Sequence, residues 1–211
     1  MKPRAFFLLI LVFFVYSTSH AQLVRGYGLK LGVVAANQSW RYTGTAELPT
    51  DHRWGFTAVG YLELLDIPIL SALVEVQYTQ KGMSESLPIT TESQPEGTGE
   101  FITKRPRVDY LSIPVLAKVR LSMPVVVPYL VAGPRLDFLL SKKGEGYDAV
   151  INKFKTTGFG ATLGVGVEVT SLLPISLLAE FRYNPSFDDA FSNSFLTVKN
   201  RSLDFLLGVR L

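Results

Sequence analysis

Cysteine is absent from the 211 residues of this chain, and histidine occurs only at His20 and His52. The absence of cysteine excludes a disulfide scaffold, a thiol nucleophile and a cysteine-bound metal. His20 lies in a segment that we expect to be removed, and a histidine metal site needs more than one histidine. The acids also lack the spacing of a calcium loop. We therefore expect no metal and no cofactor.

The chain also has little excess charge and no basic block. Its 21 Lys and Arg against 18 Asp and Glu give a formal net charge of +3, which offers nucleic acid no basic surface. After residue 21 no apolar run approaches the roughly 20 residues that a membrane-spanning helix needs. A hydrophobic content of 47% nevertheless excludes a disordered chain.

The first 21 residues have the pattern of a secretory signal peptide. Lys2 and Arg4 supply its basic start, and residues 5–16 form an apolar core. Ser19 and Ala21 place small residues at a cleavage site before Gln22. The alternative is an N-terminal anchor, but this core is shorter than a spanning helix. We expect Sec-type export and cleavage, which leaves residues 22–211 as one mature domain.

Apolar and polar residues alternate with a period of two along most of the mature chain, which predicts β-strands. The short connections 66–68, 122–124 and 171–174 each contain proline, and the long connections between them are polar. Strict alternation of short turns and long loops is typical of an outer-membrane barrel. The prediction is all-β, an eight-stranded antiparallel up-and-down transmembrane β-barrel with strands at 26–38, 53–65, 69–82, 107–121, 125–140, 156–169, 175–184 and 200–211 and long loops at 39–52, 83–106, 141–155 and 185–199.

The composition of the two strand faces indicates which one points inward. In a soluble barrel the apolar face would line the interior. Along 158–168, however, glycines take most of the polar-face positions, which suits a crowded lumen better than a water-facing surface. Aromatic residues near strand ends fit interfacial girdles, and these are Tyr27, Trp54, Tyr78, Tyr110, Tyr129, Phe138 and Tyr183. We therefore place lipid outside and the polar face inside.

The inward face carries acids and bases in near balance, as a buried ionic interior requires. An eight-stranded barrel has room only for its own side chains, so these charges should form a structural plug. The alternative is an ion pathway. We expect Glu75 to pair with Lys118 or Arg120, and Arg182 with Asp204. The predicted lumen network comprises Lys30, Glu63, Glu75, Lys118, Arg120, Arg135, Asp137, Glu168, Glu180, Arg182, Asp204 and Arg210.

An ordered set of short motifs resembles a known family. The chain is similar to the outer-membrane β-barrel domain proteins of Bacteroidetes, the PorT-like group. The resemblance implies an eight-stranded barrel, and one branch of the group takes part in secretion, although no residue here singles that branch out. The motifs are Gly28-Leu29-Lys30-Leu31-Gly32, residues 75–82, Tyr110-Leu111-Ser112-Ile113-Pro114, residues 128–134, Glu180-Phe181-Arg182-Tyr183 and Gly208-Val209-Arg210-Leu211.

Three hypotheses for function follow. The first is a non-enzymatic, monomeric barrel in the bacterial outer membrane, in contact with its lipid, whose loops meet envelope or secretion proteins, with 83–106 as the main contact surface. The second is a lipid-modifying enzyme with His52 in its site, which would need a serine and an orienting acid nearby. The third is a narrow channel. We favour the first, with no catalytic residues.

Overall fold

The computed structural model describes residues 24–44, 47–65, 67–91, 93, 95, 97–121, 123–170 and 175–211. The segment expected to be a signal peptide lies outside these residues. So do Asp66, Ser122 and 171–174 in the three short connections.

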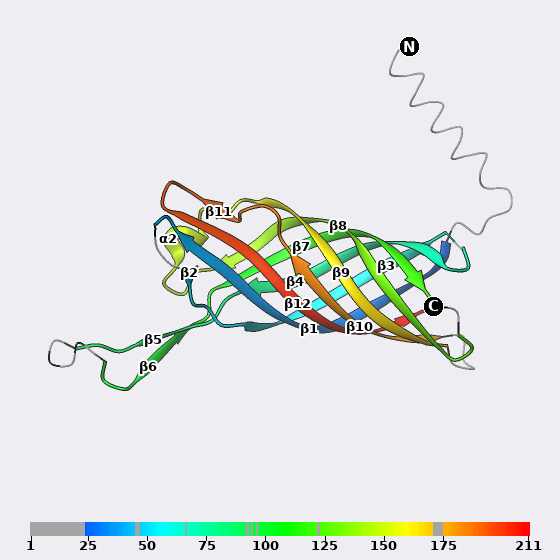
Figure 1. Ribbon diagram of the computed structural model, residues 1–211, viewed down its shortest axis with the longest axis horizontal. Coiled ribbons are helices and arrows are strands. Elements are labelled where there is room, and N and C mark those ends of the chain that lie inside the picture. Colours follow the sequence, from blue (N-terminus) through cyan, green and yellow to red (C-terminus); the bar gives the residue numbers. More distant parts are fainter. Residues whose placement is uncertain are drawn as a thin grey trace, which may run out of the picture.

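Eight long antiparallel strands close into a barrel (Figure 1). Each pairs with the next along the chain, and β1 pairs with β12 from Gly28 opposite Arg210 to Tyr42 opposite Leu196. This closure leaves no free edge among the eight, as a lipid-exposed sheet requires. The predicted fold is confirmed. The strands are β1 (Val24–Tyr42), β3 (Arg53–Leu64), β4 (Leu70–Gly82), β7 (Arg107–Arg120), β8 (Val126–Lys143), β9 (Thr157–Thr170), β10 (Ser176–Pro185) and β12 (Leu196–Arg210).

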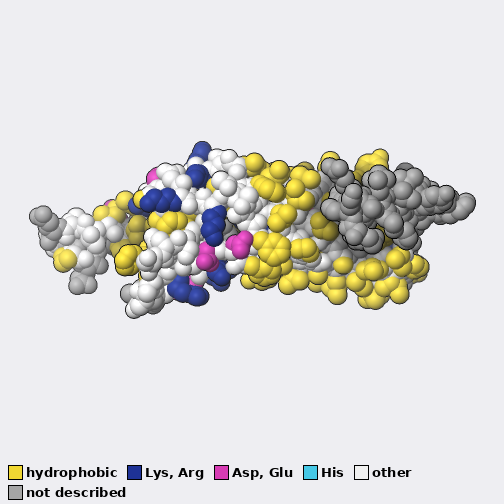
Figure 2. Space-filling model, turned by 90° about the horizontal axis from the view of Figure 1, so that it is seen from above, with side chains coloured by type: hydrophobic (Ala, Val, Ile, Leu, Met, Phe, Trp, Pro, Cys, Tyr) yellow, Lys and Arg dark blue, Asp and Glu magenta, His cyan; other side chains and the backbone are white. Residues whose placement is uncertain are grey.

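The wall has an apolar outer face and a polar inner face. Leu29, Leu31 and Val33 of β1 are exposed, whereas Lys30 and Val34 at alternate positions are buried. Figure 2 shows the apolar side chains as a wide band, with Lys and Arg gathered toward the loop end. The predicted assignment of the two faces therefore holds on every long strand. Among the described residues no helix is long and apolar enough to cross a membrane.

The main departure from the predicted elements is at the loop end. The predicted strand ends fall short of the observed ones, because β1, β8 and β12 continue past the apolar band, and in β1 and β12 the extensions pair with each other. The long loops are also more ordered than expected. They contain β2 (Glu47–Leu48), β5 (Glu85–Pro88), β6 (Phe101–Lys104), α2 (Asp148–Ile151) and β11 (Phe191–Ser192).

Candidate functional site: a filled lumen and a closed outer mouth

The barrel interior is lined by the charges that the strand pattern places on the inner face. All of the predicted lumen residues are buried except Arg210, whose side chain is 18% exposed at the turn end. Lys81 joins them. The side chains form three clusters, which we name by position: turn-end, central and loop-end.

The turn-end cluster is built around Glu63 on β3. Its carboxylate accepts hydrogen bonds from Lys118 Nζ at 3.1 Å and Arg120 Nη1 at 2.9 Å. Lys118 also donates to Glu168 at 3.0 Å, and Arg210 reaches the same carboxylate at 2.6 Å. Two carboxylates from opposite sides of the barrel are therefore joined through one buried ammonium.

The central cluster joins two acids and two bases from three strands, β1, β4 and β10. Arg182 donates hydrogen bonds to the Glu75 carboxylate through Nη1 at 2.6 Å and Nη2 at 2.8 Å, and its Nε donates to Glu180. Lys30 Nζ donates to Glu75 at 3.0 Å and to Glu180 at 2.8 Å. The hydroxyl of Tyr129 donates to Glu180 at 2.8 Å. Each charge has an opposite partner, which offsets its cost of desolvation.

The loop-end cluster is centred on Asp137 of β8. Arg135 donates to it through Nε at 2.8 Å and Nη2 at 3.1 Å, and Lys81 donates through Nζ at 3.0 Å. Arg135 Nη1 also donates to the Ala161 carbonyl at 2.9 Å. This cluster links β4, β8 and β9 directly below the mouth of the barrel.

Both predicted ion pairs are wrong in their partners. Lys118 lies opposite Ser71 on β4, four residues along that strand from Glu75, so it meets Glu63 instead. Arg182 and Asp204 are cross-strand neighbours, but Arg182 reaches across the lumen to Glu75. Asp204 instead accepts hydrogen bonds from Gln77 Nε2 at 2.8 Å and Ser202 Oγ at 3.1 Å. In a narrow barrel, long side chains meet across the lumen rather than along one edge.

Three buried lysines also lie over tyrosine rings, which the sequence pattern does not reveal. Lys30 Nζ is 4.7 Å from the ring centre of Tyr61, and Lys118 Nζ is 4.5 Å from that of Tyr129. Lys81 Nζ is 5.0 Å from the ring centre of Tyr110. A ring face attracts a desolvated cation, so these tyrosines support the ammonium groups on the side that faces no carboxylate.

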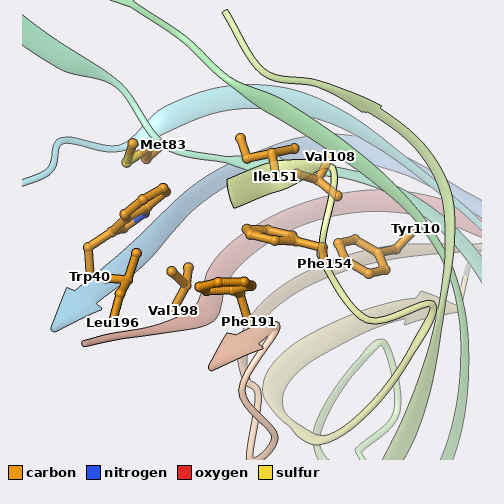
Figure 3. Packing of buried hydrophobic residues seen from close by; sticks show 9 residues of the cluster. All are labelled: Trp40, Met83, Val108, Tyr110, Ile151, Phe154, Phe191, Leu196 and Val198. Atoms are coloured by element: carbon orange, nitrogen blue, oxygen red, sulfur yellow. The ribbon is translucent and has the colours of Figure 1, made fainter. Parts of the chain in front are cut away.

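An apolar cluster closes the mouth above the ionic clusters (Figure 3). The loop ends of β1, β7 and β12 supply five of its nine buried side chains, and the loops with α2 and β11 supply the other four. Trp40 packs edge-on against Tyr147 at 5.4 Å between ring centres. We call it the outer cap. The strand pattern does not predict this cluster, because many of its apolar residues are scattered in segments expected to be polar loops. Its buried members are Trp40, Met83, Val108, Tyr110, Ile151, Phe154, Phe191, Leu196 and Val198.

A layer of amides separates the outer cap from the charges. Trp40 Nε1 donates to Gln38 at 3.2 Å, Gln38 Nε2 to Asn200 at 2.9 Å, and Asn200 Nδ2 to the Tyr110 hydroxyl at 3.1 Å. These bonds satisfy polar groups between an apolar and an ionic layer. A hollow of about 410 Å³ lies at the turn end beside Arg120, Glu168 and Arg210, and beyond it the lumen is filled by successive packed layers up to the mouth.

His52 lies on the outer surface of the barrel, away from the lumen. Within the described residues it makes no hydrogen bond or ion pair, although it borders the backbone of Ser202. The hydroxyl of that serine points inward and donates to Asp204. The neighbouring Asp51 has its backbone paired with Ser84. The geometry therefore does not bring a serine and an acid together on His52.

The filled lumen predicts that the barrel does not conduct ions. Purified protein reconstituted in a planar bilayer should give no steady current steps, because the ionic clusters and the outer cap occupy the path. Protein-free detergent is the blank, and an open porin inserted in the same bilayer is the positive control. Reproducible steps of one defined conductance would contradict the prediction and favour the channel hypothesis.

Comparison with known proteins agrees with this architecture. The sequence profile of the outer membrane protein beta-barrel domain matches residues 16–192. No curated protein sequence matches the chain. Among solved structures, Neisserial surface protein A is 20% identical with a TM-score of 0.46, over 87% of this chain and 96% of that one.

Two further structures are similar at lower identity. Ail, the attachment invasion locus protein of Yersinia pestis, is 10% identical with a TM-score of 0.39, over 88% of this chain and 98% of that one. The outer membrane protease OmpT from Escherichia coli is 9% identical with a TM-score of 0.44, over 92% and 98%. The family assignment rests on the profile, which spans most of the chain. The chain belongs to the outer membrane protein beta-barrel domain family and is an integral barrel of the bacterial outer membrane.

Proposed function

We propose that this barrel is a non-enzymatic docking protein, whose filled lumen holds the outer loops in place and whose β5–β6 hairpin binds a protein partner at the cell surface. The observation that carries the proposal is the hairpin itself. It projects well beyond the mouth of the barrel and presents apolar side chains where nothing in this chain covers them (Figure 1).

The hairpin has the chemistry of a contact surface. Leu87 on β5 pairs with Ile102 on β6, and Pro88 pairs with Phe101. The side chains of Phe101 and Ile102 are 64% and 54% exposed. β5 and β6 pair only with each other, so each has a free edge among the described strands. A free edge beside exposed apolar residues is suited to pairing with an extended segment of another protein.

The base of the hairpin is anchored to the outer cap. The backbones of Asp51 and Ser84 exchange hydrogen bonds of 2.8 and 3.0 Å, and Arg105 N donates to Glu145 at 2.8 Å. The Tyr147 hydroxyl donates to Glu85. Burial raises the pKa of the Glu85 carboxyl, and the nearby ammonium of Lys104 opposes this shift. An isolated two-stranded hairpin is marginal in water, so these anchors matter for its shape.

The proposal has three further parts. The absence of a catalytic grouping around His52 supports a non-enzymatic role. The motifs at 28–32, 110–114 and 180–183 support membership of the PorT-like group of Bacteroidetes, and with it an envelope or secretion partner. We also propose that the barrel works as a monomer after export and cleavage of residues 1–21.

Replacing Phe101 and Ile102 with aspartate should abolish partner binding while the barrel still folds. Phe101 and Ile102 lie on opposite faces of the hairpin, so the two charges would remove its apolar contact on both faces without touching the lumen. A photocrosslinking residue at Leu87, which faces Ile102, should give one discrete adduct in intact cells, and the double variant should reduce that adduct at least tenfold.

Phe195 offers a matched control, because it is 75% exposed on a different loop. Phe195→Asp should leave the adduct unchanged. The proposal fails if the double variant and the wild type crosslink equally, or if no discrete adduct forms at Leu87. Heat-modified migration in SDS gels checks that each variant is folded.

A further inference from the structure

A groove runs along the outer surface of the wall where β1 meets β12. It has a volume of about 300 Å³ and is lined by Ala35, His52, Tyr183, Arg201, Ser202 and Leu203. We call it the wall groove. It lies outside the lumen, and none of the apolar hairpin residues Leu87, Phe101 and Ile102 lines it, so the proposed docking role does not use it.

A small residue in an aromatic row creates the groove. Ala35 lies between Trp54 on β3 and Leu203 on β12, and Leu203 in turn pairs with Tyr183 on β10. Trp54 and Tyr183 are 64% and 41% exposed. With only a methyl group at Ala35, the wall is hollow between the two larger rings.

The cross-strand neighbours on the turn side and on the loop side of the groove indicate its depth in the membrane. On the turn side, Val33 lies between Phe56 and Phe205, and all three side chains are exposed in the apolar band. On the loop side, Arg201 lies opposite Asn37, and His52 borders the same space. Tryptophan and tyrosine mark the boundary between hydrocarbon and headgroups. The groove is therefore at the headgroup level of the outer leaflet.

The polar side chains at the groove are suited to an anion. Arg201 is exposed and makes no ion pair with any described residue, whereas its neighbour Lys199 lies 3.5 Å from Asp189. No carboxylate lines the groove. The Ser202 hydroxyl is directed into the lumen, so the polar side chains left at the groove are the guanidinium of Arg201, the imidazole of His52 and the hydroxyl of Tyr183, of which only the first two can carry a positive charge. A guanidinium binds a phosphate through two parallel hydrogen bonds.

Exposed apolar side chains follow the groove toward the turns on the same strands. Leu31 and Val33 of β1 and Phe205 and Leu207 of β12 form the two rows that follow Ala35 and Leu203, and all four are exposed. A cationic groove above an exposed apolar surface matches a molecule with a charged head and acyl chains. A free anion would bind only to the cationic groove and would make no use of the apolar surface.

We propose that the wall groove binds the phosphorylated headgroup of an outer-leaflet lipid, with Arg201 and His52 on the phosphate and an acyl chain along β1 and β12. Bound there, the lipid fixes the rotation and height of the barrel in the membrane. This orientation is independent of any protein partner at the hairpin.

Native mass spectrometry of the full barrel in detergent, titrated with diphosphorylated lipid A, tests this. The wild type should retain one lipid. The double variant Arg201→Ala with His52→Ala should bind at least tenfold more weakly, because it loses the charged hydrogen bonds to the phosphate. Ala35→Leu, which fills the hollow without changing charge, should weaken binding in the same direction.

Lys143→Ala is the matched control, because Lys143 is an exposed cation at the loop end of β8, away from the groove. It should bind like the wild type, and lipid A stripped of its phosphates should bind the wild type as weakly as the double variant. Equal losses in Lys143→Ala and the double variant would mean diffuse charge attraction and would overturn the proposal. So would undiminished binding by the double variant or by the dephosphorylated lipid.

Discussion

Replacing Glu75 with alanine is expected to lower the free energy of unfolding of the barrel by about 3–5 kcal/mol. The change removes the carboxylate that accepts from Lys30 at 3.0 Å and from Arg182 at 2.6 and 2.8 Å. Two buried cations then share Glu180 alone. A buried cation that has lost its carboxylate partner still bears the full free-energy cost of desolvation. This cost is larger than the net stabilisation that the ion pair itself provided. Urea unfolding in lipid vesicles, followed by the fluorescence of Trp40 and Trp54, measures the loss.

Lys199→Ala provides the surface comparison. Its ion pair with Asp189 spans 3.5 Å and is substantially exposed, so its removal should cost less than about 1 kcal/mol. Adding Lys30→Ala to Glu75→Ala restores the charge balance of the central cluster. The double variant should therefore lose less stability than the sum of the two single variants. A Glu75→Ala variant no less stable than Lys199→Ala would show that the central cluster does not stabilise the barrel.

The strands and their faces could be predicted from the sequence because both depend on a local period of two. Alternate residues of a strand point to opposite sides, so a run such as 28–34 already separates Lys30 from Leu29 and Leu31. Balanced charge and glycine on one face then identify the inside. The structure places every predicted lumen residue there, which shows how strongly a closed barrel couples local pattern to global position.

The ion pairs could not be predicted in the same way, because they depend on stagger between strands that are distant in sequence. Arg182 and Glu75 are separated by 107 residues and meet only after the barrel has closed. The outer cap was missed for a different reason. Trp40, Met83, Phe154 and Phe191 fall singly in four polar loops and have no periodicity. These residues pack together only once the loops have converged at the mouth of the folded barrel.

Gly32→Ala is expected to destabilise the barrel by about 1–3 kcal/mol through the seam that closes it. Gly32 lies opposite Leu206 in the β1–β12 ladder, and an added Cβ would lie 1.8 Å from the Phe205 carbonyl oxygen and 3.0 Å from the Leu206 Cα. These are backbone atoms, which cannot turn aside as a side chain does. The two strands must therefore move apart at the junction of the first and last strands of the barrel.

Gly60→Ala on β3 is the matched test of this reasoning. Its added Cβ would meet only Leu29 Cδ2, at 3.7 Å, which is ordinary contact. It should change stability by less than about 0.5 kcal/mol. Hydrogen exchange should separate the variants further, with faster exchange of the β1–β12 amides in Gly32→Ala and no change in Gly60→Ala. Equal stability of both variants would mean that the seam tolerates a side chain at Gly32, and that barrel closure does not depend on this close approach of the two backbones.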